Sequence, residues 1–149
     1  MLSKSLSILR LMVKDHQKIE DLLNKLEEET KNDFDSMEKA FIKFEWELEK
    51  HIFTEEKAIF TSYRPDDVIE GYKMLPELTK QHNYILNRLN NWREDIRKKR
   101  ILTDIYSFKD FLNRHRNFEE EKVYPNLDES LPEKEKKHII TKINEIVQK

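Results

Sequence analysis

The sequence predicts an all-α protein: an up-down-up-down four-helix bundle with a short fifth helix at its carboxyl end. Four long segments carry apolar residues spaced alternately three and four positions apart, which is typical of helices that face a common core. Charged residues make up 39% of the chain and hydrophobic residues 37%, with one Gly against four Pro. Long helices with solvated outer faces have this composition, whereas sheets need more turns. We expect residues 1–149 to form one domain.

Each of the four segments contributes one apolar seam to the predicted core. The seams are Met12, His16, Ile19, Leu23 and Leu26; then Phe41, Phe44, Leu48, His51, Glu55 and Ile59; then Leu75, Leu78, His82, Ile85, Leu89, Trp92 and Ile96; and then Ile101, Ile105, Phe108, Leu112, His115, Glu119 and Val123. Every seam contains a histidine, and two of them also contain a glutamate. These polar interruptions are the feature that most needs an explanation.

The breaks between the seams predict short connections. Residues 32–36 are polar and can cap the second helix. Residues 63–71 predict either a bend or an extra turn before Pro76, which fits the first turn of the third helix, where a missing N–H is tolerated. The third break covers residues 98–104, although residues 100–105 fit either a loop or the first turn of the fourth helix.

The last part of the chain predicts an end to the fourth helix and one further helix. The residue before a proline is disfavoured in helical geometry, so the Tyr124–Pro125 step predicts the end of the fourth helix. Ser130 and Glu133 are spaced as a capping box, with Pro132 in the first turn of the fifth helix. We expect this short helix to pack on one end of the bundle.

Charge and cysteine content exclude several kinds of function. The net charge is only −2, from 28 basic and 30 acidic side chains, so the composition indicates neither a nucleic acid nor a membrane surface as a partner. The oligomeric state is left open. The chain has no Cys, which excludes disulfides and thiolate ligands. Any metal must therefore be bound by nitrogen and oxygen atoms.

The amino-terminal residues are apolar but do not resemble a secretion signal. Lys4 and Arg10 interrupt the apolar run, and the pattern continues into the first amphipathic segment. No stretch of the sequence approaches the roughly 20 apolar residues that a membrane-spanning helix needs. We expect a cytoplasmic protein.

The chain also reads as two copies of one helical hairpin. The interval from His51 to His115 equals the interval from Glu55 to Glu119, and His16 and His82 are separated by nearly the same number of residues. The residues around them also correspond, as in Lys-Asp-His-Gln-Lys-Ile and Lys-Gln-His-Asn-Tyr-Ile. Two such hairpins can build a single site on the axis between them.

Histidines and glutamates on the seams predict a buried metal site. Four of the five histidines lie one on each seam, and buried imidazoles need partners that a metal ion can supply together. Each glutamate lies one turn after a histidine, on the same helical face, where an unpaired carboxylate is costly. The predicted ligands are His16, His51, Glu55, His82, His115 and Glu119. Glu56 and Glu120 are expected to point to solvent, because five positions after the histidine the helix has turned by about 140°.

This ligand set suits a pair of metal ions. Nitrogen and carboxylate ligands suit iron, manganese or zinc, and two bridging carboxylates suit two ions with an oxo or hydroxo bridge. A single zinc ion would use fewer of these groups. The Glu-x-x-His motif of ferritin-like di-iron bundles occurs only at Glu135 and His138, in a Lys-rich stretch.

The ordered motifs resemble the hemerythrin-like (HHE cation-binding) family. The order is His16, then His51-x3-Glu55, then His82, then His115-x3-Glu119, and it covers most of the chain. The resemblance implies an up-down-up-down bundle with a non-haem di-iron centre. It also implies that the four histidines are terminal ligands and that the two glutamates bridge the ions.

The chain departs from the oxygen-carrying members of that family. They have a His-x3-His pair on the third helix, whereas Leu78 and Leu86 flank His82 here, and Glu120 stands in place of an Asp. The ligand set is more similar to the di-iron domain of bacterial iron–sulfur-cluster repair proteins, which carry an additional Cys-bearing domain. We therefore expect chemistry other than reversible oxygen storage.

The resemblance and the ligand set support a stand-alone di-iron protein that binds or reacts with O2, NO or peroxide, which leaves open whether it is an enzyme. An iron-responsive regulatory module without catalysis is the alternative. A structural or phosphotransfer bundle using His138 is a third. Near the site, Glu47 is either an additional carboxylate or an outer-face residue, and Tyr84 and Tyr106 are candidates for the ligand entrance.

Overall fold

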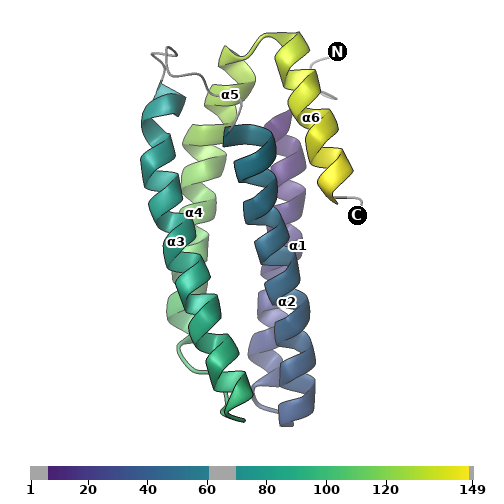
Figure 1. The fold of residues 1–149 in the computed structure, drawn as a ribbon, viewed down its shortest axis with the longest axis vertical. Coiled ribbons are helices and arrows are strands. Elements are labelled where there is room, and N and C mark those ends of the chain that lie inside the picture. Colours follow the sequence, from purple (N-terminus) through teal and green to yellow (C-terminus); the bar gives the residue numbers. More distant parts are fainter. Residues whose placement is uncertain (1–6, 61–69, 148–149) are drawn as a thin grey trace.

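A computed structural model of the chain confirms the all-α fold (Figure 1). It describes residues 7–60 and 70–147, with only the backbone described for residues 70–73. The first four helices run alternately up and down, and the last two follow at one end. The elements are α1 (Ile8–Glu29), α2 (Phe34–Thr54), the π-helical turn η2 (Glu55–Ile59), α3 (Glu70–Arg97), α4 (Ile105–Phe118), the π-helical turn η4 (Glu119–Val123), α5 (Tyr124–Ser130) and α6 (Glu133–Val147).

Side-chain caps start the first two helices. The Ser7 hydroxyl accepts a hydrogen bond from the backbone N–H of Arg10 at the start of α1. Asp33 accepts one from the N–H of Ser36 at 2.8 Å, so the predicted cap of α2 is confirmed. Such bonds satisfy amide groups that have no partner within the helix. The carboxylate of Asp128, in α5, accepts from the N–H of Ile8 at 2.8 Å and thereby closes the upper end of the bundle.

The third helix begins earlier than predicted. It starts at Glu70, so Pro76 lies inside α3 and not in its first turn. A proline inside a helix costs about 3 kcal/mol, because it removes a hydrogen bond and crowds the preceding turn. Met74 and Leu75 pack against an apolar cluster, and this burial stabilises the turn before the proline. Most of the predicted bend at residues 63–71 lies outside the described residues.

The fourth helix does not end at Pro125, which corrects the second predicted boundary. The chain passes from α4 through η4 directly into α5. The N–H of Tyr124 bonds to the carbonyl of Glu119, and Pro125 then occupies the first turn of α5, where its missing N–H is tolerated. The connection before α4 is a loop, with Lys99 and Asp104 in the left-handed region at φ 61°. The predicted fifth helix is present as α6, but its predicted capping box is wrong, because Ser130 ends α5 and Pro132 precedes α6, which begins at Glu133.

Two apolar clusters fill the bundle, and the polar seam residues lie between them. The lower cluster includes Phe41, Phe44, Trp92 and Phe108, near the α1–α2 and α3–α4 connections. The upper cluster lies under α5 and α6; its buried members are Ile8, Met12, Ala58, Ile59, Leu78, Val123, Tyr124, Leu127, Ile139, Ile140 and Ile143. The histidine on each long helix follows one cluster and precedes the other along the chain, which places it at mid-height in the bundle.

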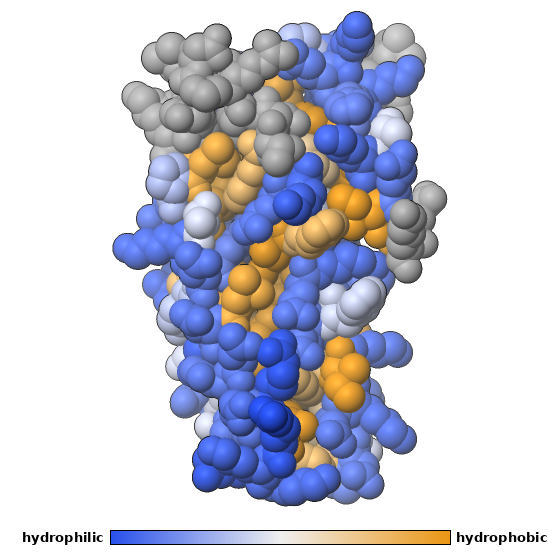
Figure 2. All heavy atoms as spheres, viewed as in Figure 1, coloured by the Kyte–Doolittle hydropathy of each residue, from blue (hydrophilic) through white to orange (hydrophobic). Residues whose placement is uncertain are grey.

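The outer surface is largely hydrophilic. On the face with α2 and α3 in front, hydrophilic side chains cover the helices, and hydrophobic residues show along a broken strip between them (Figure 2). Within the described part of the chain, no helix combines the length and apolar character that crossing a membrane requires.

Candidate metal centre

The structure brings all six residues that the sequence singled out into one buried cluster. His16, His51, His82 and His115 come from α1, α2, α3 and α4 respectively. Glu55 and Glu119 are the first residues of the two π-helical turns. None of the six side chains is more than 6% exposed. Six polar side chains thus share the middle of an otherwise apolar interior.

The two carboxylates lie between the four imidazoles. Glu119 Oε1 is 3.1 Å from His16 Nε2 and 3.2 Å from His115 Nε2. Glu55 Oε1 is 3.1 Å from both His51 Nε2 and His82 Nε2. Each carboxylate therefore faces one histidine of its own helix and one from another helix, so both are placed to bridge two positions.

The ligand atoms form two overlapping groups. Glu55, His82, His115 and Glu119 each offer an atom within 4.8 Å of the others, and so do His16, His51 and Glu119. Glu119 belongs to both groups, and Glu55 Oε1 also lies 3.1 Å from His51 Nε2. The arrangement suits two cations side by side with carboxylates between them.

The outer nitrogen of each imidazole has an acceptor of its own. The four Nδ1 contacts are His16 to Glu120 Oε2 at 2.7 Å, His51 to Asp15 Oδ2 at 2.6 Å, His82 to Glu56 Oε2 at 3.1 Å and His115 to Gln81 Oε1 at 2.5 Å. Each Nδ1 can therefore carry the proton and donate it outward. In the neutral imidazole this leaves the Nε2 lone pair pointing into the cluster, as metal ligation requires.

Without a cation, the inner atoms of the cluster are poorly satisfied. His16 Nε2 and His51 Nε2 lie 3.1 Å apart, where two lone pairs would repel each other. His115 Nε2 and Glu119 Oε2 are buried and have no well-formed hydrogen bond among the described residues. Buried polar atoms without partners are rare in folded proteins. These atoms fit a cation better than they fit one another.

The pKa values of His51 and Glu119 show that the cluster favours positive charge. Burial lowers the pKa of His51, but the charge of Glu55 and the hydrogen bonds to Asp15 and Glu119 outweigh it and hold that pKa well above its usual value. Burial raises the pKa of Glu119, but the neighbouring His115 outweighs it, so that pKa lies well below its usual value. The site thus favours positive charge beside ionised carboxylates, and either protons or metal ions can provide it.

The expectation that Glu56 and Glu120 point to solvent was only partly right: their side chains are 43% and 24% exposed, yet both contact the cluster. Their carboxylates accept from His82 and His16, each on a different helix from the glutamate. The prediction considered only the histidine of the same helix, from which position five does turn away. Both glutamates also lie in π-helical turns, which are frequently found at functional sites. The repeated Glu-Glu pair in the two hairpins was the available signal.

Sequence reasoning also missed three residues that contact the cluster. Asp15 and Gln81 immediately precede His16 and His82, and their repeat was visible in the sequence. Tyr124 is buried, and its hydroxyl donates to Glu55 Oε2 at 2.5 Å. Burial, and then the charges of Glu119 and Glu55, raise the pKa of Tyr124 well above its usual value, so it remains a neutral donor.

The residues left undecided by the sequence lie away from the cluster. Glu47 forms ion pairs with Lys18 and Lys50 and not with the six residues, although its side chain is only 13% exposed. The Tyr84 ring packs against Phe111 with ring centroids 4.2 Å apart, and Tyr84 is 42% exposed. Tyr106 is 79% exposed. The structure gives neither tyrosine a contact with the six residues.

An antiparallel helical bundle with histidine and carboxylate side chains converging at its middle belongs to the class of cation-binding bundles. The chain belongs to the hemerythrin HHE cation binding domain family, whose model matches residues 7–127, most of the sequence. No curated protein and no solved structure is significantly similar to the chain.

Proposed function

We propose that this protein binds two iron ions in the six-residue cluster and that the centre binds or reacts with O2, NO or peroxide. His16 and His51 would hold one ion, His82 and His115 the other, and Glu55 and Glu119 would lie between them. The observation that carries the proposal is the orientation of the imidazoles: every Nδ1 has its own acceptor, and every Nε2 faces a bridging carboxylate.

The resemblance to the hemerythrin-like family, and not the donor set, favours iron over manganese and zinc. Imidazole and carboxylate ligands without thiolate suit all three metals, whereas the resemblance implies a di-iron centre. Two imidazoles and shared carboxylates leave an iron ion with open positions. Iron bound there would supply redox chemistry to a small ligand, while the protein excludes bulk water from a site buried between two apolar clusters.

The test is to reconstitute the purified protein with ferrous iron without oxygen and to measure its iron content and visible spectrum. We expect about two irons per chain, as two shared-carboxylate positions require, and a new absorption band on adding O2, NO or peroxide. His51→Ala and Glu119→Ala should lose most of the iron. His138→Ala is the matched control, because His138 is exposed on α6, away from the cluster.

Two results would contradict the proposal. One is iron content in His51→Ala or Glu119→Ala equal to that of the wild type. The other is a fully loaded protein whose spectrum none of the three ligands changes, which would leave iron binding but remove the ligand chemistry.

An iron-responsive regulatory module without catalysis is supported by one specific contact. The carboxyl-terminal helix α6 packs against η2, the turn that begins with Glu55. A change in metal occupancy at Glu55 would therefore act directly on the turn beneath α6. This alternative predicts that iron raises the melting temperature and protects the amides of α6 from hydrogen exchange. Equal melting temperatures with and without iron would remove it.

A further inference from the structure

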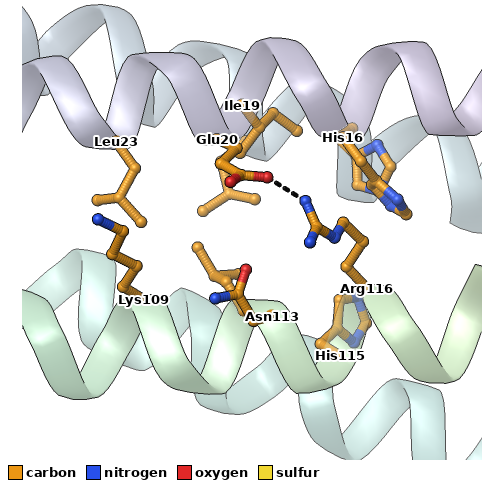
Figure 3. A pocket seen from close by; sticks show the side chains of 11 residues that line it. His16, Ile19, Glu20, Leu23, Lys109, Asn113, His115 and Arg116 are labelled. Atoms are coloured by element: carbon orange, nitrogen blue, oxygen red, sulfur yellow. Dashed lines mark hydrogen bonds and ion pairs between the residues drawn. The ribbon is translucent and has the colours of Figure 1, made fainter.

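A small cavity adjoins the metal centre between α1 and α4 (Figure 3). Its volume is about 40 Å³, and three of its lining residues are His16, His51 and His115. A single water molecule needs about 10–15 Å³ of such volume. The cavity therefore has room for a molecule of two or three heavy atoms beside the ligand atoms, and not for an organic substrate of ordinary size.

Four apolar side chains form part of the cavity wall, and the other lining residues besides the histidines are polar and partly exposed: Glu20, Lys109, Asn113 and Arg116. Ile19 and Leu23 contribute from α1, Leu48 from α2 and Leu112 from α4. Ile19, Leu23 and Leu48 are buried. Where it contacts the four apolar side chains, a charged molecule would lose its hydration without gaining hydrogen bonds, whereas an uncharged one loses little. This apolar part of the wall favours a small neutral occupant.

An ion pair spans the outer side of the cavity. Glu20 on α1 accepts from Nη1 of Arg116 on α4, and Figure 3 shows the pair joining the two helices in front of the apolar side chains. The two side chains are 33% and 28% exposed, so they lie at the solvent boundary, whereas His16 and His115 are buried. The buried Nε of Arg116 has no acceptor among the described residues, so only part of the guanidinium holds the contact.

We propose that this cavity is the chamber through which a small neutral molecule, a diatomic gas or hydrogen peroxide, reaches the metal centre, and that the Glu20–Arg116 pair is its gate. This inference rests on the proposed function for the identity of the ligand. The cavity is the route because it joins the inner histidines to a solvent boundary closed by a pair of side chains. An ion pair at the solvent boundary is weak and opens readily, so it limits the rate of access without sealing the site.

The chamber can be tested with xenon, a neutral probe that binds small apolar cavities without any chemistry at the metal. The full chain is labelled at its Ile and Leu methyl groups and followed by NMR under xenon pressure. We expect shifts of the Ile19, Leu23 and Leu48 methyls. Leu112→Phe fills the cavity and should abolish them. If these methyl signals do not shift in the wild type, or shift equally in Leu112→Phe, the proposal that the cavity is a chamber is contradicted.

The gate can be tested with variants that break the ion pair without touching the histidines. Arg116→Gln and Glu20→Gln should each speed xenon exchange, and NO association with the ferrous protein, by about two- to fivefold, the range expected for an exposed ion pair. Arg93→Gln is the matched control, because Arg93 pairs with Glu45 between α3 and α2, and neither lines the cavity. Unchanged rates in both gate variants, or an equal increase in the control, would overturn the gate.

The two kinds of measurement separate this inference from the function on which it rests. Xenon binding in a protein whose ferrous form takes up no NO would leave the chamber standing and remove the proposed ligand chemistry. NO uptake in a protein that binds no xenon, with rates unaffected by Leu112→Phe, would leave the function standing and remove the chamber.

Discussion

The two helical hairpins supply the same ligands to the centre but differ in the residues that support them. In the first, His51 Nδ1 contacts the carboxylate of Asp15; in the second, His115 Nδ1 contacts the neutral amide oxygen of Gln81. The Asp15 carboxylate remains ionised: burial raises its pKa, but the hydrogen bond to His51 outweighs it and lowers the value below the usual one. The pseudo-symmetry thus holds for the ligand residues but not for Asp15 and Gln81, which contact them.

The difference makes the two halves of the centre electrostatically unequal. The pair His16 and His51 is supported by two carboxylates, those of Glu120 and Asp15. The pair His82 and His115 is supported by one carboxylate, Glu56, whose side chain is 43% exposed and partly screened by water. A histidine that donates to a carboxylate is a more basic ligand. The His16–His51 half should therefore hold a cation more tightly.

A second difference lies just beyond the π-helical turns. Phe60 and Tyr124 occupy corresponding positions in the two repeats. Phe60 stacks on His82, with ring centroids 5.5 Å apart, while Tyr124 donates its hydroxyl to Glu55. One ring therefore shields the centre, and the other also holds a bridging carboxylate in place.

The largest predicted effect comes from changing the charge of Asp15 or Gln81, the residues that accept from the Nδ1 atoms of His51 and His115. Asp15→Asn keeps an acceptor for His51 but removes the charge, and should weaken the tighter metal-binding step by about 10- to 100-fold. Gln81→Glu should strengthen the other step. Calorimetric titration of the metal-free protein with zinc or anaerobic ferrous iron resolves the two steps. Equal effects of Asp15→Asn and Gln81→Asn would show that the two halves are equivalent.

Exchanging the aromatic pair tests the second difference. Tyr124→Phe leaves Glu55 Oε2 without its buried donor and should lower the free energy of unfolding of the metal-free protein by about 1–2 kcal/mol. Phe60→Tyr adds a hydroxyl to a side chain that is itself partly exposed, and should change the free energy of unfolding little. Urea unfolding at constant pH measures both. A larger loss in Phe60→Tyr than in Tyr124→Phe would contradict the proposed difference between the two positions.

The two glutamates that follow the bridging ones should differ in a smaller way. Glu120 lies 2.7 Å from His16 Nδ1 and its side chain is 24% exposed, whereas Glu56 lies 3.1 Å from His82 Nδ1 and its side chain is 43% exposed. Glu120→Gln should therefore reduce metal affinity more than Glu56→Gln does. Competition with a chromophoric chelator measures the ratio, and the reverse order would contradict the assignment.

The smallest predicted effect concerns the connections at the other end of the hairpins. Asp33 caps α2, and its hydrogen bonds with Ser36 hold its pKa below 3.8, whereas Asp104 makes no side-chain cap to α4. Because the folded-state pKa of Asp33 is the lower one, its contribution to stability is present above about pH 3.8 and is lost as the pH falls through that lower value. Asp33→Ala should remove this dependence and lower the melting temperature slightly, and Asp104→Ala should not. Thermal unfolding between pH 2 and 6 compares them, a range that brackets the ordinary carboxyl pKa of roughly 4; identical curves for the two variants would contradict the cap.

The sequence by itself determined the bundle and the six convergent residues. An apolar seam with a period near 3.6 can only be buried against other helices, and a histidine on each seam must then meet the other three inside. The helix ends were less certain. Pro76 predicted the start of the third helix, but burial of the preceding turn lets α3 begin earlier. Pro125 predicted the end of the fourth helix, but a π-helical turn carries the chain on into α5. In both places local propensity is weaker than packing.

Only the tertiary structure decided which atoms support the ligands and where the centre opens. Glu56 and Glu120 reach histidines on other helices, and Asp15 and Gln81 act across the α1–α2 and α3–α4 pairs. Glu20 and Arg116 are far apart in the sequence and meet only because α1 packs beside α4. Periodicity along one helix specifies which face is buried, but it does not contain the rotation and height of the neighbouring helix, and those quantities select the partners.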